Sequence, residues 1–110
     1  TQPYQAYAGG VLVLSARHMV HSNGFSNRYW GWGAEDDDFA KRLEEAGYTV
    51  QRKRPFCEYG VFKSLSEHHH RETEDHNRVE KLRWALTFMQ FDGLHSLYYK
   101  IISRKDGLKS

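Results

Sequence analysis

Apolar residues along the chain fall first into short runs of the kind that form strands. Residues 11–14, Val-Leu-Val-Leu, are continuously apolar and follow two glycines, which is typical of a strand buried on both faces. Residues 48–51 alternate in polarity, and 56–62 and 97–102 are two further strand candidates. The pattern therefore predicts a sheet.

Apolar residues also recur at helical spacing in three places. A short helix is predicted over 16–21, with Ser15 as its cap and Asn23-Gly24 as its end. A second helix is predicted from a block of acids to about Ala46, where a glycine ends it. A third apolar face consists of Val79, Leu82, Leu86 and Met89. Sheet and helices together predict an α/β fold, a mixed sheet with about three helices.

Composition narrows the class of protein. The chain has 110 residues, enough for one modest domain, and its net charge of +2 gives a nucleic-acid partner little electrostatic support. Aromatic residues make up 15%, a high share that favours a site for flat partners. Cys57 is the only cysteine, so the chain has no internal disulfide and no cysteine-rich zinc site. No apolar run approaches the roughly 20 residues of a membrane span.

The densest candidate chemistry is a run of four acids, Glu35 to Asp38, which follows a loop with two tryptophans. Acids at the start of a helix gain about 0.3–1 kcal/mol each from the helix dipole, but four in a row also repel one another. Crowding raises the pKa of at least one carboxyl group toward the range of a general base. Helix capping and an active-site cluster are both open interpretations.

The two tryptophans, Trp30 and Trp32, also have two interpretations. Either they belong to the core, or Trp32, which has a glycine on each side, lies on a loop that closes over a ligand. Sugars suit such a site, because their C–H faces pack on indole rings and their hydroxyl groups bind carboxylates.

Three segments carry a resemblance to a known family. Residues 23–27, 29–33 and 35–38 read NGFSN, YWGWG and EDDD and resemble the signature of the β-1,4-galactosyltransferases. The similarity continues upstream in 3–10 and downstream in 92–97, where a histidine stands in place of the family's asparagine. The resemblance implies transfer of galactose, with inversion, from UDP-galactose to the 4-hydroxyl group of an acceptor sugar. N-acetylglucosamine, glucose and xylose are the acceptors in question.

The resemblance also implies a fold, a location and partners. Residues 1–110 are expected to be the C-terminal catalytic part of a GT-A nucleotide-sugar transferase, because the family's upstream Asp-x-Asp motif does not occur before Gly9. The fragment alone is therefore expected to be inactive. The complete protein is expected in the Golgi lumen, with a membrane anchor only upstream of this chain. Its expected partners are a UDP-sugar donor and an oligosaccharide or glycoconjugate acceptor, with no nucleic acid.

The family's functional residues carry over to individual positions. Asp36 matches the catalytic base that takes the proton of the acceptor hydroxyl group. Asp38 is expected to be structural, or a helper at the helix start. The residues that match substrate-binding positions are Tyr4, Tyr7, Trp32, Gly33, Glu35, Asp37 and Arg78.

Three consecutive histidines, 68–70, form a second candidate cluster. Neighbouring side chains of an extended chain point to opposite sides, so His68 and His70 share a face. On the residues alone, a solvated loop is the plainer interpretation. The resemblance implies instead that His68 and His70 bind Mn²⁺, which accepts imidazole and oxygen ligands. The His-x-His pair is similar to the family branch that transfers galactose to xylose.

Two other functions remain open from the sequence. One is an N-acetylgalactosaminyltransferase on the same fold. The other is a non-catalytic carbohydrate-binding module that keeps the aromatic residues and lacks the metal. Dependence of UDP binding on manganese distinguishes an enzyme from such a module.

Overall fold

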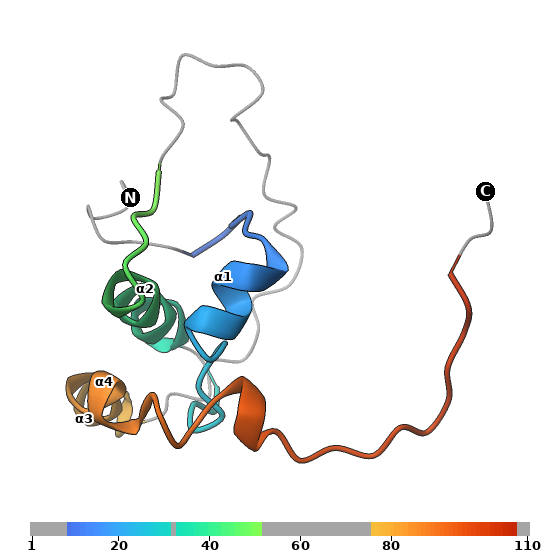
Figure 1. Cartoon of the computed structure of the whole chain (residues 1–110). Helices are drawn as coiled ribbons and strands as arrows, with labels where there is room; N and C mark the ends of the chain where they lie inside the picture. Colours follow the sequence, from blue (N-terminus) through green and yellow to red (C-terminus); the bar gives the residue numbers. More distant parts are fainter. Residues whose placement is uncertain (1–8, 32, 52–75, 108–110) are drawn as a thin grey trace.

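A computed structural model of the chain describes residues 9–31, 33–51 and 76–107. The helices found in these ranges are α1 (Ala16–His21), α2 (Glu35–Glu45), α3 (Arg78–Arg83), α4 (Ala85–Phe88) and the 3-10 helix η2 (Leu94–Ser96). Helix α2 packs on both α3 and α4, which lie beneath it in Figure 1, while the segment after η2 extends away from the helices. None of the described helices combines the length and the apolar character needed to cross a bilayer.

The predicted mixed sheet is the main error of the sequence analysis, because the described residues contain no strand. Residues 11–14, 48–51 and 97–102 are irregular, and 56–62 lies outside the described ranges. The two valines of 11–14 are 58% and 90% exposed, so this segment is not buried on both faces. A strand is stable only when a neighbour takes up its backbone N–H and C=O groups. Within the described ranges these segments have no such neighbour, and the α/β assignment is therefore wrong there.

Helix α1 forms where it was predicted because both of its ends are capped. Ser15 Oγ accepts a hydrogen bond from the N–H of His18 at 3.4 Å, and the N–H of Ser15 donates to His18 Nδ1 at 3.0 Å. Beyond the other end, Asn23 and Gly24 have φ values of 59° and 64°. The N–H of Gly24 donates to the carbonyl of Met19 at 2.9 Å, which closes the helix and turns the chain toward α2.

Helix α2 starts in the acidic run and ends near Gly47, as the spacing predicted. Its N-cap, Ala34, has a left-handed φ of 71° and makes no capping hydrogen bond through its side chain. The acids of the first turn therefore provide the negative charge that a helix N-terminus favours. The apolar face buries Phe39 and Leu43, and the ring of Phe39 stacks on Phe25 with a centroid distance of 4.1 Å.

The third predicted helix is divided into two short helices, α3 and α4. Trp84 lies between them with φ −96° and ψ 10°, away from helical values, so the helix breaks at this residue. Val79 and Leu86, which were predicted to share one apolar face, are exposed. Of the residues in α3 and α4, only Ala85 is fully buried.

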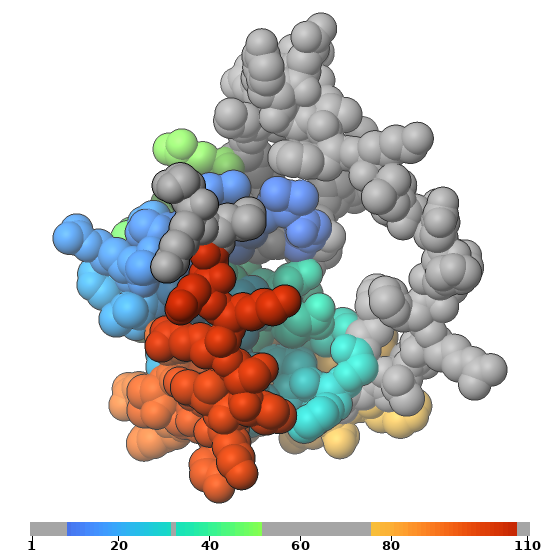
Figure 2. Space-filling model, turned by 90° about the vertical axis from the view of Figure 1, so that its right-hand side faces the viewer, coloured from blue at the N-terminus to red at the C-terminus, as the bar shows by residue number. Residues whose placement is uncertain are grey.

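Among the described residues, four buried side chains are polar or charged and three are apolar. The buried apolar residues are Phe39, Leu43 and Ala85, and the buried polar residues are Ser22, Asp38, Arg42 and Asp92. In the space-filling view, which looks at the right-hand side of Figure 1, the extended C-terminal residues in red stand in front of the helices (Figure 2). The polar part of the interior lies where α2 meets Asp92 and the loop after α1.

Candidate active site

The four consecutive acids form the first turn of α2, so their side chains point in different directions. Successive residues of a helix are about 100° apart, which separates Asp36 and Asp38 by about 200° around the axis. Asp38 is fully buried, whereas Glu35, Asp36 and Asp37 are partly exposed. By exposure, the first turn thus has an inner side, the fully buried Asp38, and an outer side, the partly exposed Glu35 to Asp37.

Both carboxylate oxygens of Asp38 are engaged within the protein. Oδ1 accepts a hydrogen bond from Arg42 Nε at 2.7 Å, and Oδ2 accepts one from the hydroxyl group of Tyr29 at 2.7 Å. Burial first, and the bond to Asp38 second, raise the pKa of Tyr29, so its hydroxyl group stays protonated and keeps donating. Asp38 therefore has a structural role, as the sequence led us to expect.

On the outer side of the turn, the surroundings disfavour the charged form of two acids, Asp36 and Asp37. Burial, and secondly the negative charge of Glu35, raise the pKa of Asp36. Burial also raises the pKa of Asp37, although the charge of Lys41 opposes this. Oε2 of Glu35 is buried without a hydrogen-bond partner. A carboxylate with a raised pKa is a stronger base, and a buried acceptor without a partner suits a hydroxyl group of a ligand.

Gly33 and Arg78 meet beside this turn, although they are far apart in the sequence. A Cβ atom added to Gly33 would lie 3.1 Å from Cδ and 3.5 Å from Nε of Arg78. The φ of 111° at Gly33 also favours glycine. Because Arg78 is the first residue of α3, the structure brings the start of α3 against the loop that leads into the acids.

The other predicted site residues lie outside the described ranges. These are Tyr4, Tyr7, Trp32, His68 and His70. Trp30, next to this loop's glycines, is 79% exposed, so the core interpretation is wrong for this tryptophan. Within residues 9–31, 33–51 and 76–107, no three histidine, cysteine or acidic side chains gather as a metal ion would need. The acidic turn is therefore not a metal site by itself.

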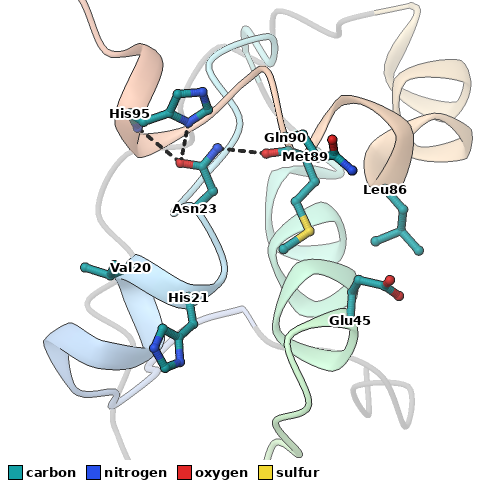
Figure 3. A pocket seen from close by; sticks show the side chains of 8 residues that line it. All are labelled: Val20, His21, Asn23, Glu45, Leu86, Met89, Gln90 and His95. Carbon is teal, nitrogen blue, oxygen red and sulfur yellow. Dashed lines mark hydrogen bonds between the residues drawn. The ribbon is translucent and has the colours of Figure 1, made fainter.

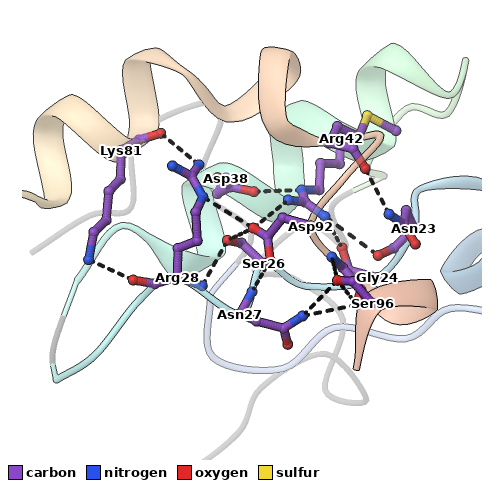
Figure 4. Close-up of polar contacts among 12 residues, drawn as sticks. Asn23, Gly24, Ser26, Asn27, Arg28, Asp38, Arg42, Lys81, Asp92 and Ser96 are labelled. Atoms are coloured by element: carbon purple, nitrogen blue, oxygen red, sulfur yellow. Dashed lines mark hydrogen bonds and ion pairs between the residues drawn. The ribbon is translucent and has the colours of Figure 1, made fainter. Parts of the chain in front are cut away.

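Asp92 is a buried acid to which the sequence analysis assigned no structural role, since it entered there only as part of the motif 92–97. Its carboxylate accepts hydrogen bonds from Ser26 Oγ, from the N–H of Asn27 at 2.9 Å, and from Arg28 Nε at 3.2 Å (Figure 4). It also pairs with Arg42 Nη2 at 3.4 Å. Burial alone would raise the pKa of Asp92, but these donors and positive charges together lower it.

Arg42 joins the two buried acids to the loop after α1. Its Nη1 donates to the carbonyl oxygens of Gly24 at 3.2 Å and Asn23 at 3.5 Å, while its other nitrogens contact Asp38 and Asp92. The spacing of four residues between Asp38 and Arg42 is the signal that sequence reasoning could have used. The contacts of Arg42 to Asn23, Gly24 and Asp92 have no local signal, because they join distant parts of the chain.

A half-open pocket of about 500 Å³ lies at the other end of α2 (Figure 3). Its lining residues are Val20, His21, Asn23, Glu45, Leu86, Met89, Gln90 and His95. A helix rises about 1.5 Å per residue, so Glu45 lies about 15 Å along the axis from Glu35. The pocket is therefore separate from the acidic turn.

Comparisons with known proteins agree with the motifs that surround the acidic turn. A family model described as the N-terminal domain of galactosyltransferase matches residues 1–70. The chain is 39% identical to β-1,4-galactosyltransferase 5 of Danio rerio over 104 residues, 94% of this chain and 27% of the relative. It is 40% identical to human β-1,4-galactosyltransferase 6 over 98 residues, 89% of this chain and 25% of the relative.

A third relative is mouse β-1,4-galactosyltransferase 1. The chain is 38% identical to it over 101 residues, 91% of this chain and 25% of the relative. The chain spans about a quarter of the length of the curated relatives it matches. The resemblance seen in the motifs is thus confirmed across nearly the whole chain, which belongs to the β-1,4-galactosyltransferase family.

Proposed function

We propose that the complete protein is an inverting, metal-dependent glycosyltransferase that moves galactose from UDP-galactose to the 4-hydroxyl group of an acceptor sugar. Family membership supports galactosyl transfer. The structural observation that supports the mechanism is the division of the acidic turn. The internal ion pair engages Asp38 and leaves Asp36 on the outer side, where its pKa is raised.

Asp36 is the proposed catalytic base. In an inverting transfer, the acceptor hydroxyl oxygen attacks the anomeric carbon of galactose while the bond from that carbon to the diphosphate oxygen breaks. UDP leaves with the electrons of the broken bond, and the hydroxyl proton passes to a carboxylate oxygen of Asp36. Burial and the charge of Glu35 raise the pKa of Asp36, which makes it a better proton acceptor than an ordinary surface aspartate.

The neighbouring residues are proposed to hold the acceptor sugar. Oε2 of Glu35 is a buried oxygen without a hydrogen-bond donor, and a sugar hydroxyl group would supply one. Asp37 is the second proposed hydroxyl ligand. Arg78, which packs against Gly33, is proposed to border the acceptor. Three aromatic residues outside the described ranges complete the proposed site, namely Tyr4, Tyr7 and Trp32.

Mn²⁺ is the proposed cofactor, with His68 and His70 as ligands outside the described residues. When bound, the ion would supply positive charge near the departing diphosphate. The described residues do not form a metal site, so no step of the mechanism above is assigned to the ion. Titration of the metal-free complete protein with UDP, with and without manganese, tests this assignment. UDP binding that is indifferent to manganese would contradict it and favour a carbohydrate-binding module.

The family also leads us to propose the Golgi lumen as the location, with any membrane anchor upstream of this chain. We expect the complete, tagged protein to co-localise with a Golgi marker in cells. A protease applied to sealed Golgi vesicles should leave this chain intact, since the lumen is protected. Digestion without detergent would contradict the proposed orientation.

An activity assay of the complete protein tests the proposed reaction. UDP-galactose and UDP-N-acetylgalactosamine are offered with N-acetylglucosamine, glucose and xylose as acceptors, and galactose transfer is the expected outcome. Asp36→Asn should lower kcat by about 10³-fold while acceptor binding is largely kept. Glu44→Gln, which changes an exposed acid on the same helix, is the matched control and should retain activity. An Asp36→Asn variant as active as the wild-type protein would exclude Asp36 as the base.

A further inference from the structure

Arg42 is the largest fully buried side chain among the described residues. Its guanidinium group contacts three separate parts of the chain: Asp38 on its own helix at 2.7 Å, Asp92 at 3.4 Å and the carbonyl of Gly24 at 3.2 Å. A guanidinium group is planar and its donors have fixed directions. Contacts in three directions therefore fix how α2 is turned relative to the rest of the protein.

The surroundings of this guanidinium group leave little space for an alternative arrangement. A Cβ atom added to Gly93 would lie 2.8 Å from Arg42 Nη1 and would collide with the carbonyl oxygen of Asn23. The backbone of the turn after Asp92 thus lies directly against Arg42. Only a residue without a side chain allows this approach, so Gly93 belongs to the same packed unit.

The charges of the ion pairs around Arg42 balance. Arg42 and Arg28 carry two positive charges, and Asp38 and Asp92 carry two negative charges (Figure 4). Arg28 is 25% exposed, whereas the side chains of Arg42 and Asp38 are fully buried. Without the guanidinium group, Asp38 would be a buried carboxylate without its positive partner, and it would be driven toward water.

We propose that Arg42 is a positioning residue that, by holding Asp38 in the interior, sets the rotation of α2 and thereby directs Asp36 toward the acceptor sugar. The inference rests on the proposed function of Asp36. Because Asp36 and Asp38 are in the same turn of α2, a rotation of the helix that released Asp38 would turn Asp36 by the same angle. Tyr29 acts with Arg42, since its hydroxyl group holds the second oxygen of Asp38 at 2.7 Å.

Two variants of the complete protein test this inference. Arg42→Lys keeps the charge and removes the guanidinium geometry. Tyr29→Phe keeps the ring and removes one donor to Asp38. Arg17→Lys, the same exchange at an exposed position of α1, is the control for Arg42→Lys. For each variant, kcat and the acceptor KM are measured and kcat is divided by the fraction of folded, donor-binding protein.

A positioning role predicts that kcat per folded molecule falls by about 10-fold in Arg42→Lys and about 3-fold in Tyr29→Phe, with acceptor KM changed less than about 3-fold. A purely structural role lowers the folded fraction and leaves kcat per folded molecule at the wild-type value, which would overturn the inference. If Arg42→Lys does not fold, Tyr29→Phe decides in the same way. Wild-type protein without transfer activity, or a fully active Asp36→Asn variant, would instead overturn the proposed function.

Discussion

The inner and outer sides of the first turn of α2 use the same kind of residue for opposite purposes. On the inner side, Asp38 is surrounded by donors and pairs with Arg42 at 2.7 Å. On the outer side, Asp36 lies beside Glu35, whose charge adds to burial in raising its pKa. The inner acid is paired with an arginine inside the fold, whereas burial and a neighbouring negative charge oppose ionisation of the outer acid. The comparison shows how four adjacent acids are tolerated in one turn.

The largest effect is expected on stability from Asp38→Asn. The asparagine is similar in size but leaves Arg42 as a buried charge with a weakened partner, which typically costs about 3–5 kcal/mol. Asp36→Asn, two residues earlier on the outer side, is the matched control and should not lower the free energy of unfolding at pH 7, because the fold disfavours the charge of Asp36. Urea unfolding of the complete protein measures both. Equal losses in the two variants would mean that the two sides do not differ.

Gly93→Ala should have the next largest effect, because the inner side depends on close approach of the backbone. The added Cβ would lie 2.8 Å from both Nη1 of Arg42 and Cγ of Asn23, and it would strike the Asn23 carbonyl. Overpacking of this kind typically costs about 1–3 kcal/mol. Gly107→Ala is the control, since its added Cβ would meet no atom within 4 Å. Unfolding of the two variants in urea gives the comparison, and an unaffected Gly93→Ala variant would show that the turn can move away from Arg42.

The elements that the sequence predicted well are those that local signals define. Helix α1 has its serine cap at Ser15 and its left-handed end at Asn23 and Gly24, all within a few residues of the helix. Helix α2 has a helical apolar period and a glycine at its end. Such signals act through neighbouring residues, so a single sequence contains them.

The elements that were wrong depend on distant partners. Residues 11–14 and 97–102 have the composition of strands, but composition does not supply the neighbouring strand that would pair with them. The break at Trp84 has no glycine or proline to announce it. Asp92 has no local signal of burial, because its partners lie 50 to 66 residues earlier in the chain. The acidic turn itself was identified from its motif, whereas its division into two sides required the position of Arg42.

A pH dependence sharpens the comparison further, with a smaller expected effect. The pKa of Asp92 is lowered in the folded protein, so its charged form stabilises the fold. This contribution is present above the unfolded pKa of about 3.9 and is lost as the pH falls through the folded pKa. Asp92→Asn should therefore weaken the decline of stability between neutral and acidic pH, measured by urea unfolding at several pH values. Asp106→Asn, at an exposed position, should leave the decline unchanged.

The smallest expected effect has the opposite sign, and it comes from the outer side. The pKa of Asp36 is raised in the folded protein, so folding favours its protonated form, and stability from this group falls as the pH rises from the unfolded toward the folded pKa. Asp36→Asn removes the unfavourable charge and should stabilise the complete protein at pH 7 by less than about 1 kcal/mol, because the residue is partly exposed. At about pH 3 the difference should vanish, since the aspartate is then protonated in both states. Urea unfolding at the two pH values measures it. A destabilised Asp36→Asn variant at pH 7 would show that the charge of Asp36 is compensated within the fold as that of Asp38 is, and the outer side would then have no carboxylate held ready for a proton.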